Sequence, residues 1–111
     1  MKENVIEIIR GQKVEIIELS VACSNDQINL FLSICVNGTI FDIHFYNVSR
    51  LNIQDLSTPM EIHGFEIICN KQKGWEKDSN YTIRDFEDGR INFVCEDFET
   101  QADVFLQNGT M

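Results

Sequence analysis

The sequence predicts an all-β protein: a single-domain antiparallel β-sandwich or partly open β-barrel of seven to eight strands, with little helix. Turn signals recur about every ten residues, and apolar residues alternate with polar ones between them. A hydrophobic content of 43% in 111 residues is enough for one packed core. Neither repeats nor linker-like tracts interrupt the chain, so we expect residues 1–111 to form one domain.

The best-defined elements are three strands at about residues 14–24, 27–36 and 39–48. Asn37-Gly38 suits a type I′ turn, whose two central residues need positive φ, and Asn25-Asp26 can close the preceding hairpin in the same way. Both turns point the same apolar residues of the middle strand inward, so a one-residue slip would expose them. The predicted cross-strand pairs are Val36 with Thr39, Ile34 with Phe41, Leu32 with Ile43, Leu30 with Phe45, Cys23 with Ile28, Val21 with Leu30, Leu19 with Leu32 and Ile17 with Ile34.

The other face of these three strands mixes polar and apolar side chains. This mixture is too apolar for open water and too polar for a dry core, which indicates half-burial under a loop, a second sheet or a partner. The residues on this face are Phe31, Ser33, Cys35, Ile40, Asp42, His44 and Tyr46.

The segments that flank these strands give weaker signals. Residues 4–9 fit a first strand or a helical turn almost equally well. A short strand or a helical turn is possible through Leu51 and Ile53, before the break at Pro59. Residues 61–70 are again strand-like, and Gly64 within them predicts a bulge or a close backbone approach.

The C-terminal part predicts a further hairpin over residues 81–99. A three-residue loop at 87–89 with Gly89 in the left-handed region gathers the apolar residues on one face better than a two-residue turn does. A final short strand is expected at 104–106. The favoured loop pairs Ile83 with Phe93 and Tyr81 with Cys95.

Charge and composition exclude several classes of function. A net charge of −9 and a pI near 4.5 oppose binding to nucleic acid or to anionic membranes, since both need a basic surface. No apolar run is long enough to span a bilayer, and the N-terminus does not resemble a secretory signal, so we expect a cytoplasmic protein. The four cysteines lack metal-site spacing, and buried, reduced thiols are their expected state.

Motifs for catalysis are missing from the sequence. Asp42 and His44 could form an acid–base couple, but no nucleophile motif accompanies them, and His63 is expected to be a strand residue and not a ligand. Residues 85–89 are only superficially like a calcium loop, because the glycine comes one position early and strands flank it. We therefore predict no catalytic residue, no cofactor and no metal site, and we do not expect an enzyme.

The acidic residues are unevenly distributed. Residues 76–103 contain nine Asp or Glu against three Lys or Arg, which gives −6 of the total −9. Such a surface either keeps the protein soluble or steers a basic partner. Trp75, in a polar loop, either covers the core or anchors a partner. The predicted partner-binding residues are Trp75, Glu76, Asp85, Phe86, Glu87, Asp88, Glu96, Asp97 and Glu99.

A family resemblance rests on three segments of the second half of the chain: Gly-Phe-Glu-Ile-Ile at 64–68, Lys-Gly-Trp-Glu at 73–76 and Tyr-Thr-Ile-Arg-Asp-Phe-Glu-Asp-Gly-Arg-Ile-Asn-Phe at 81–93. They resemble small acidic β-rich bacterial proteins encoded beside polymorphic toxins, including those of contact-dependent growth inhibition, which act as immunity proteins. The resemblance implies stoichiometric binding and neutralisation of a cognate toxin domain, often a nuclease with a basic cleft. It assigns no individual binding residue.

Two other functions remain open at this point. The first is a small-ligand carrier, a closed barrel whose pocket is lined by Phe31, His44 and Tyr46. The second is an enzyme that uses His44. For the immunity protein we expect a monomer that forms a complex only with its toxin.

Overall fold

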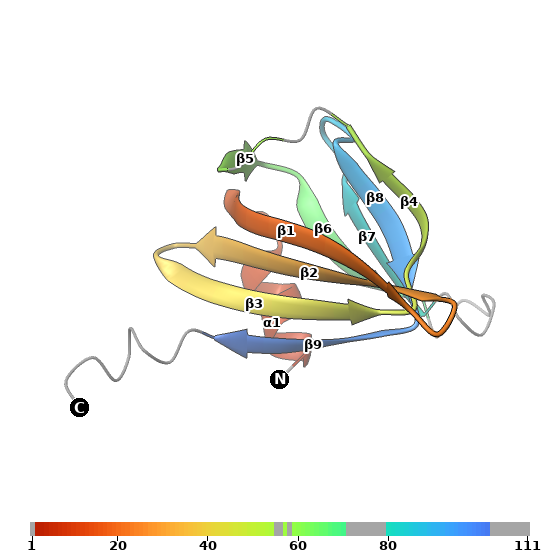
Figure 1. Ribbon diagram of the computed structural model, residues 1–111. Helices are drawn as coiled ribbons and strands as arrows, with labels where there is room; N and C mark the ends of the chain where they lie inside the picture. Colours follow the sequence, from red (N-terminus) through yellow and green to blue (C-terminus); the bar gives the residue numbers. More distant parts are fainter. Residues whose placement is uncertain (1, 55–56, 58, 71–79, 103–111) are drawn as a thin grey trace.

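Alternating apolar and polar residues build two antiparallel sheets, and their apolar faces meet in one core (Figure 1). The computed structural model describes residues 2–54, 57, 59–70 and 80–102. One sheet has the strand order β5-β1-β2-β3-β9 and the other has the order β4-β8-β7-β6. The elements are α1 (Lys2–Ile9), β1 (Val14–Ser24), β2 (Gln27–Val36), β3 (Thr39–Tyr46), β4 (Ser49–Ile53), β5 (Met60–Ile62), β6 (Phe65–Cys69), β7 (Tyr81–Asp85), β8 (Ile91–Cys95) and β9 (Asp97–Ala102).

The predicted all-β sandwich is thereby confirmed, and the two separate sheets do not close into a barrel. Phenylalanines from both sheets join the layers at the centre. Phe45 of β3 and Phe93 of β8 meet edge to face with ring centroids 4.9 Å apart, and Phe98 of β9 is fully buried beside Phe45. Burying one such ring stabilises the fold by roughly 1.5–3 kcal/mol.

Helix α1 covers the side of the core between the edge strands β6 and β9, which it contacts. Val5 and Ile9, four residues apart and therefore on one helix face, are buried, whereas Ile8 is exposed. Of the two interpretations of residues 4–9, the helical one is correct.

The register of the central strands is confirmed except at one position. All the predicted β2–β3 pairs are present, and Asn25, Asp26, Asn37 and Gly38 all have the positive φ that the two turns require. The first three predicted β1–β2 pairs also form. The fourth is wrong: a β-bulge at Ile17 brings Ile16 opposite Ile34.

The bulge changes which side chains of β1 face the core. Ile16 is fully buried, whereas Ile17 is 39% exposed. N-terminal to the bulge, Glu15 lies opposite Cys35 and thus on the outer face of the sheet, where the unbulged register would have placed it inside.

Two stretches predicted as single strands cross from one sheet to the other. Residues 61–70 form β5 in the five-stranded sheet and β6 in the four-stranded sheet, with the break at His63-Gly64. The close approach predicted at Gly64 is confirmed, because a Cβ there would lie 2.7 Å from the backbone nitrogen of Glu87. Residues 91–99 divide in the same way at Glu96 into β8 and β9. These two divisions explain why the described residues contain nine strands and not seven or eight.

The remaining predictions for the C-terminal half have mixed outcomes. The β7–β8 register has Ile83 opposite Phe93, as predicted, and Gly89 has a φ of 66°. The segment through Leu51 is the strand β4. The strand predicted at 104–106 lies outside the described residues. The cysteines are free, as expected, but only Cys95 is buried, and the prediction of burial is wrong for Cys23 and Cys69, which are exposed.

Candidate functional site

The predicted partner-binding residues do not form one surface. Phe86, Glu87 and Asp88 lie in the loop at one end of β7 and β8, whereas Glu96 and Asp97 lie where the chain leaves β8 at its other end. The five residues of β8 separate these groups by about 16 Å, at about 3.3 Å per residue. Trp75 and Glu76 fall outside the described residues.

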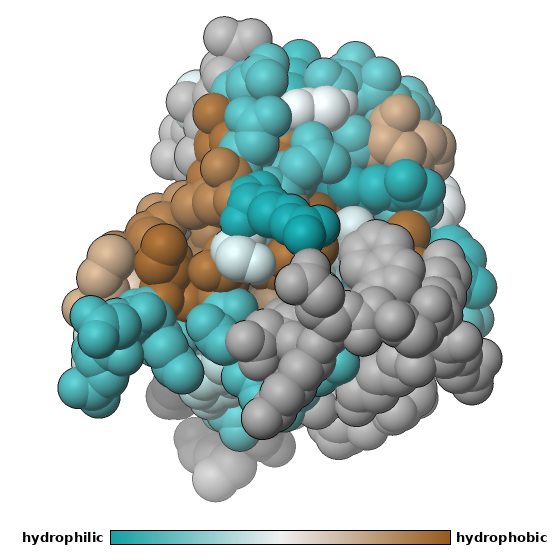
Figure 2. All heavy atoms as spheres, turned by 90° about the vertical axis from the view of Figure 1, so that its right-hand side faces the viewer, coloured by the Kyte–Doolittle hydropathy of each residue, from teal (hydrophilic) through white to brown (hydrophobic). Residues whose placement is uncertain are grey.

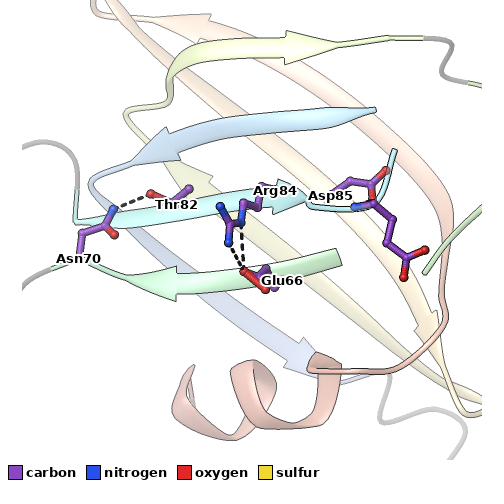
Figure 3. A network of polar contacts seen from close by, with 6 residues as sticks. Glu66, Asn70, Thr82, Arg84 and Asp85 are labelled. Atoms are coloured by element: carbon purple, nitrogen blue, oxygen red, sulfur yellow. Dashed lines mark hydrogen bonds and ion pairs between the residues drawn. The ribbon is translucent and has the colours of Figure 1, made fainter. Parts of the chain in front are cut away.

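Asp85 has a structural position. Its side chain is 2% exposed, and Oδ1 accepts hydrogen bonds from the backbone N–H groups of Glu87 and Asp88, both at 3.2 Å. Oδ2 accepts a third from the N–H of Arg90 at 3.3 Å. Because the carboxylate is buried and organises the β7–β8 loop, we reassign Asp85 from partner contact to loop stabilisation. Figure 3 shows its position at the end of β7.

The other predicted residues differ in exposure. Phe86 is 56% exposed, and Glu87 and Asp88 are exposed beside it. Glu96 and Asp97 are half-buried: Glu96 accepts a hydrogen bond from the side-chain amide of Asn47 at 3.2 Å, and Asp97 accepts one from the N–H of Phe98. Glu99 is exposed, and it belongs to a different surface, the outer face of the five-stranded sheet.

On the outer face of the four-stranded sheet, polar side chains bind one another (Figure 3). Arg84 of β7 donates from Nε to Oε1 of Glu66 on β6 at 3.0 Å, and its Nη2 lies at the same distance from that oxygen. Nearby, the amide of Asn70 donates to Oγ1 of Thr82 at 2.6 Å.

The five-stranded sheet has a different charge composition. Its five strands contain six acidic residues and neither Lys nor Arg, and Lys13, directly before β1, lies 3.8 Å from the carboxylate of Glu61. We call its outward-facing side the acidic face. Its acidic residues are Glu15, Glu18, Asp42, Glu61, Asp97 and Glu99.

Strand register arranges the acidic face in cross-strand rows. One row is Glu18, Ser33, Asp42 and Gln101, from β1, β2, β3 and β9, and the next is Ser20, Phe31, His44 and Glu99. A hollow of about 680 Å³ lies over these two rows and opens to solvent. Its side-chain lining comes from Glu18, Phe31, Ser33, Asp42, His44, Glu99 and Gln101.

Three aromatic rings form a continuous stack along this face. Phe31 lies directly opposite His44 across the strands, and Tyr46 follows His44 by two residues, so all three point outward. The ring centroids of Phe31 and His44 are 4.1 Å apart, and those of His44 and Tyr46 are 3.9 Å apart. His44 Nε2 is buried in this stack and has no hydrogen-bond partner among the described residues.

Two hydroxyl groups hold two of the carboxylates in place. Ser33 Oγ donates to Asp42 Oδ1 at 2.6 Å, and the Tyr46 hydroxyl donates to Glu99 Oε1. The hydrogen bond to Glu99 raises the pKa of Tyr46 above its ordinary value of 10.0, and desolvation and the negative charges of Glu99 and Asp97 add to the shift.

Apolar side chains are also accessible near this face. Phe31 is 40% exposed, and on β1 Ile17 and Val21 are 39% and 44% exposed. Figure 2 shows an apolar area bordered by hydrophilic groups on the side of the molecule where the β1–β2 turn lies. Exposed apolar groups beside charged ones are typical of protein-binding surfaces.

Sequence reasoning found part of this site. It placed the three aromatic residues and Asp42 on one mixed face but put the binding residues in the acidic segment 76–99. Glu99 joins the face through pairing between β3 and β9, whose partner residues are more than fifty positions apart. Glu18 joins it through the pairing of β1 with β2. The signal that could have revealed the face was the absence of Lys and Arg from every strand of the central meander.

Carboxylates beside an aromatic ring are chemically suited to cations and planar groups. No group of three or more His, Cys, Asp or Glu in the described ranges is arranged to hold a metal ion. No described helix is long and apolar enough to cross a membrane. The two sheets formed by the described residues do not make the closed barrel that the carrier hypothesis required, and the hollow lies on the outside of the sandwich. Comparisons with protein-family models, curated proteins and solved structures found no match to this chain.

Proposed function

We propose that this is an immunity protein, which neutralises a bacterial toxin domain by binding it with the acidic face. One observation supports this most directly: six carboxylates share one sheet that has neither Lys nor Arg in its strands, next to the exposed ring of Phe31. The resemblance of residues 64–93 to immunity proteins of polymorphic toxin systems gives the class of partner.

The acidic face lowers the stability of the isolated protein. Glu15 and Glu61 lie directly opposite each other, and like charges in that position destabilise a sheet. Such a face becomes favourable when a basic surface covers it, since complementary charges speed association and strengthen the complex. A nuclease cleft that binds phosphate groups offers such a surface.

The charge also bears on assembly and location. Two copies of the protein would bring like-charged faces together, so we propose a monomer that forms a 1:1 complex. We also propose that the protein is cytoplasmic, because a toxin that enters the cell is neutralised there.

The proposal is tested with the toxin domain encoded beside the gene. Co-expression should restore growth of cells that make the toxin, and the purified proteins should form a 1:1 complex. Failure of both would refute the immunity function.

Two matched double variants locate the binding surface. Asp42→Asn with Glu99→Gln removes two charges from the acidic face, and Glu87→Gln with Asp88→Asn removes two from the β7–β8 loop. We expect the first pair to slow association about tenfold at low salt and to weaken its salt dependence, and the second to behave as the unmodified protein. The reverse result would move the binding surface to the loop.

A further inference from the structure

We infer that the hollow on the acidic face is a recognition site for an arginine side chain of the partner. The inference rests on the proposed function and specifies what the acidic face recognises. The hollow combines carboxylates from three strands with an exposed aromatic ring: Glu18 of β1, Asp42 of β3 and Glu99 of β9 surround Phe31 and His44.

The shape of the hollow suits a side chain that enters from outside. Its volume of about 680 Å³ lies within the roughly 300–1,000 Å³ typical of ligand sites. The small side chain of Ser33 lies in the middle of its row, and longer side chains, Glu18 and Gln101, lie at the two ends. A partner's backbone can therefore stay above the face while its side chain reaches Asp42.

The carboxylates are already oriented before a ligand arrives. Asp42 Oδ1 accepts a hydrogen bond from Ser33, and Glu99 Oε1 accepts one from Tyr46. Each carboxylate has a second oxygen for which the described residues provide no partner, and each first oxygen keeps accepting capacity. Groups held in place before binding lose less conformational entropy when the complex forms.

The aromatic stack distinguishes arginine from lysine. A guanidinium group is planar, stacks on aromatic rings and donates hydrogen bonds in a fork that matches a carboxylate. An ammonium group is strongly hydrated and cannot stack as a plane. Phe31 is 40% exposed and lies against His44, so one face of the hollow offers an aromatic surface next to Asp42.

The experiment uses small probes and the whole protein. N-acetyl-arginine amide, N-acetyl-lysine amide and the neutral isostere N-acetyl-citrulline amide are titrated while backbone amide signals are followed by NMR. We expect the arginine probe to shift the signals of Ser33, Asp42 and His44 along a saturating curve. The lysine probe should bind at least fivefold more weakly, and citrulline should leave the signals unchanged. Equal binding of the arginine and lysine probes would overturn the inference.

Three variants test the assigned roles. Asp42→Asn should weaken binding of the arginine probe at least fivefold. Asp88→Asn, which removes the same charge from the β7–β8 loop, should leave the affinity for this probe unchanged. Phe31→Leu should remove most of the preference for arginine over lysine. All three sites are exposed, so unchanged thermal unfolding serves as the folding control. Equal losses in Asp42→Asn and Asp88→Asn would contradict a specific site.

The two proposals fail separately. A toxin complex that forms although the arginine probe does not bind would refute the arginine site and leave the immunity function in place. Binding of the probe without neutralisation of any neighbouring toxin would refute the immunity function and leave the site.

Discussion

The two sheets share one core but use their polar residues in opposite ways. The strands of the four-stranded sheet contain two Arg and two acidic residues, so their net charge is zero, and the described contacts there join Arg84 to Glu66 and Asp85 to its own loop. The strands of the five-stranded sheet contain six acidic residues and no Lys or Arg, a net charge of −6. The described charges of the first sheet are paired within the molecule. The second sheet keeps a net negative charge on its outer face, although Lys13 lies beside Glu61 and Asp97 is half-buried.

This difference separates acidic residues that stabilise the fold from those that the proposed function assigns to binding. A buried carboxylate with three backbone donors is needed to fold its loop, because removing it leaves those donors without their acceptor. An exposed carboxylate contributes less to stability, and like charges that face each other across two strands destabilise the sheet. The acidic residues of this chain are therefore of two kinds, buried carboxylates that organise a loop and exposed carboxylates on a sheet. The residue type alone does not distinguish them.

The largest expected effect is the difference in stability between removing one carboxylate of each kind. Asp85→Ala should lower the free energy of unfolding by about 2–3 kcal/mol, since three backbone N–H groups lose their acceptor. Asp42→Ala, at an exposed position, should change it by less than about 0.5 kcal/mol. Urea unfolding measures both, and similar losses would remove the distinction between the two sheets.

Much of the fold followed from local signals in the sequence. Asn25-Asp26 and Asn37-Gly38 specify turns through their tolerance of positive φ, and the turns fix the register of three strands. Gly64 was identified as a close approach, but its neighbour in space, Glu87, was not, because that contact depends on the packing of β6 against β7. Local patterns give pairs of neighbouring strands and not the order of strands across sheets.

The bulge and the sheet crossings show why the site was only partly predictable. Alternation in Val14–Ser24 fits two registers, and only the packing of Ile16 against the core selects the bulged one. At Glu96 the chain bends at a single residue as it changes sheets, so the sequence resembles one strand. The acidic face depends on that change, since it is what brings Glu99 beside His44.

A smaller effect should have opposite sign in the two sheets. Glu66→Gln should destabilise the protein by about 0.3–1 kcal/mol because Arg84 loses its partly exposed ion pair. Glu15→Gln should stabilise it by a few tenths of a kcal/mol at low salt, since it removes a like charge opposite Glu61. Thermal unfolding at low and at high salt measures both changes, and salt should reduce each of them. A loss of stability in Glu15→Gln would contradict the cost assigned to the acidic face.

The smallest effect is a titration on the acidic face. The phenol of Tyr46 donates to the Glu99 carboxylate, which raises its pKa above 10.0, so Glu99→Gln should lower that pKa toward the ordinary value. For a group whose pKa is raised in the folded state, the associated stability is fully present below the unfolded value near 10 and is lost as the pH rises through the folded value. Ultraviolet absorbance of phenolate in both proteins, with Tyr46→Phe to identify the signal, measures the shift. An unchanged pKa of Tyr46 in Glu99→Gln would mean that the hydroxyl does not hold this carboxylate in place. The five-stranded sheet would then lack the Glu99 carboxylate oriented before binding.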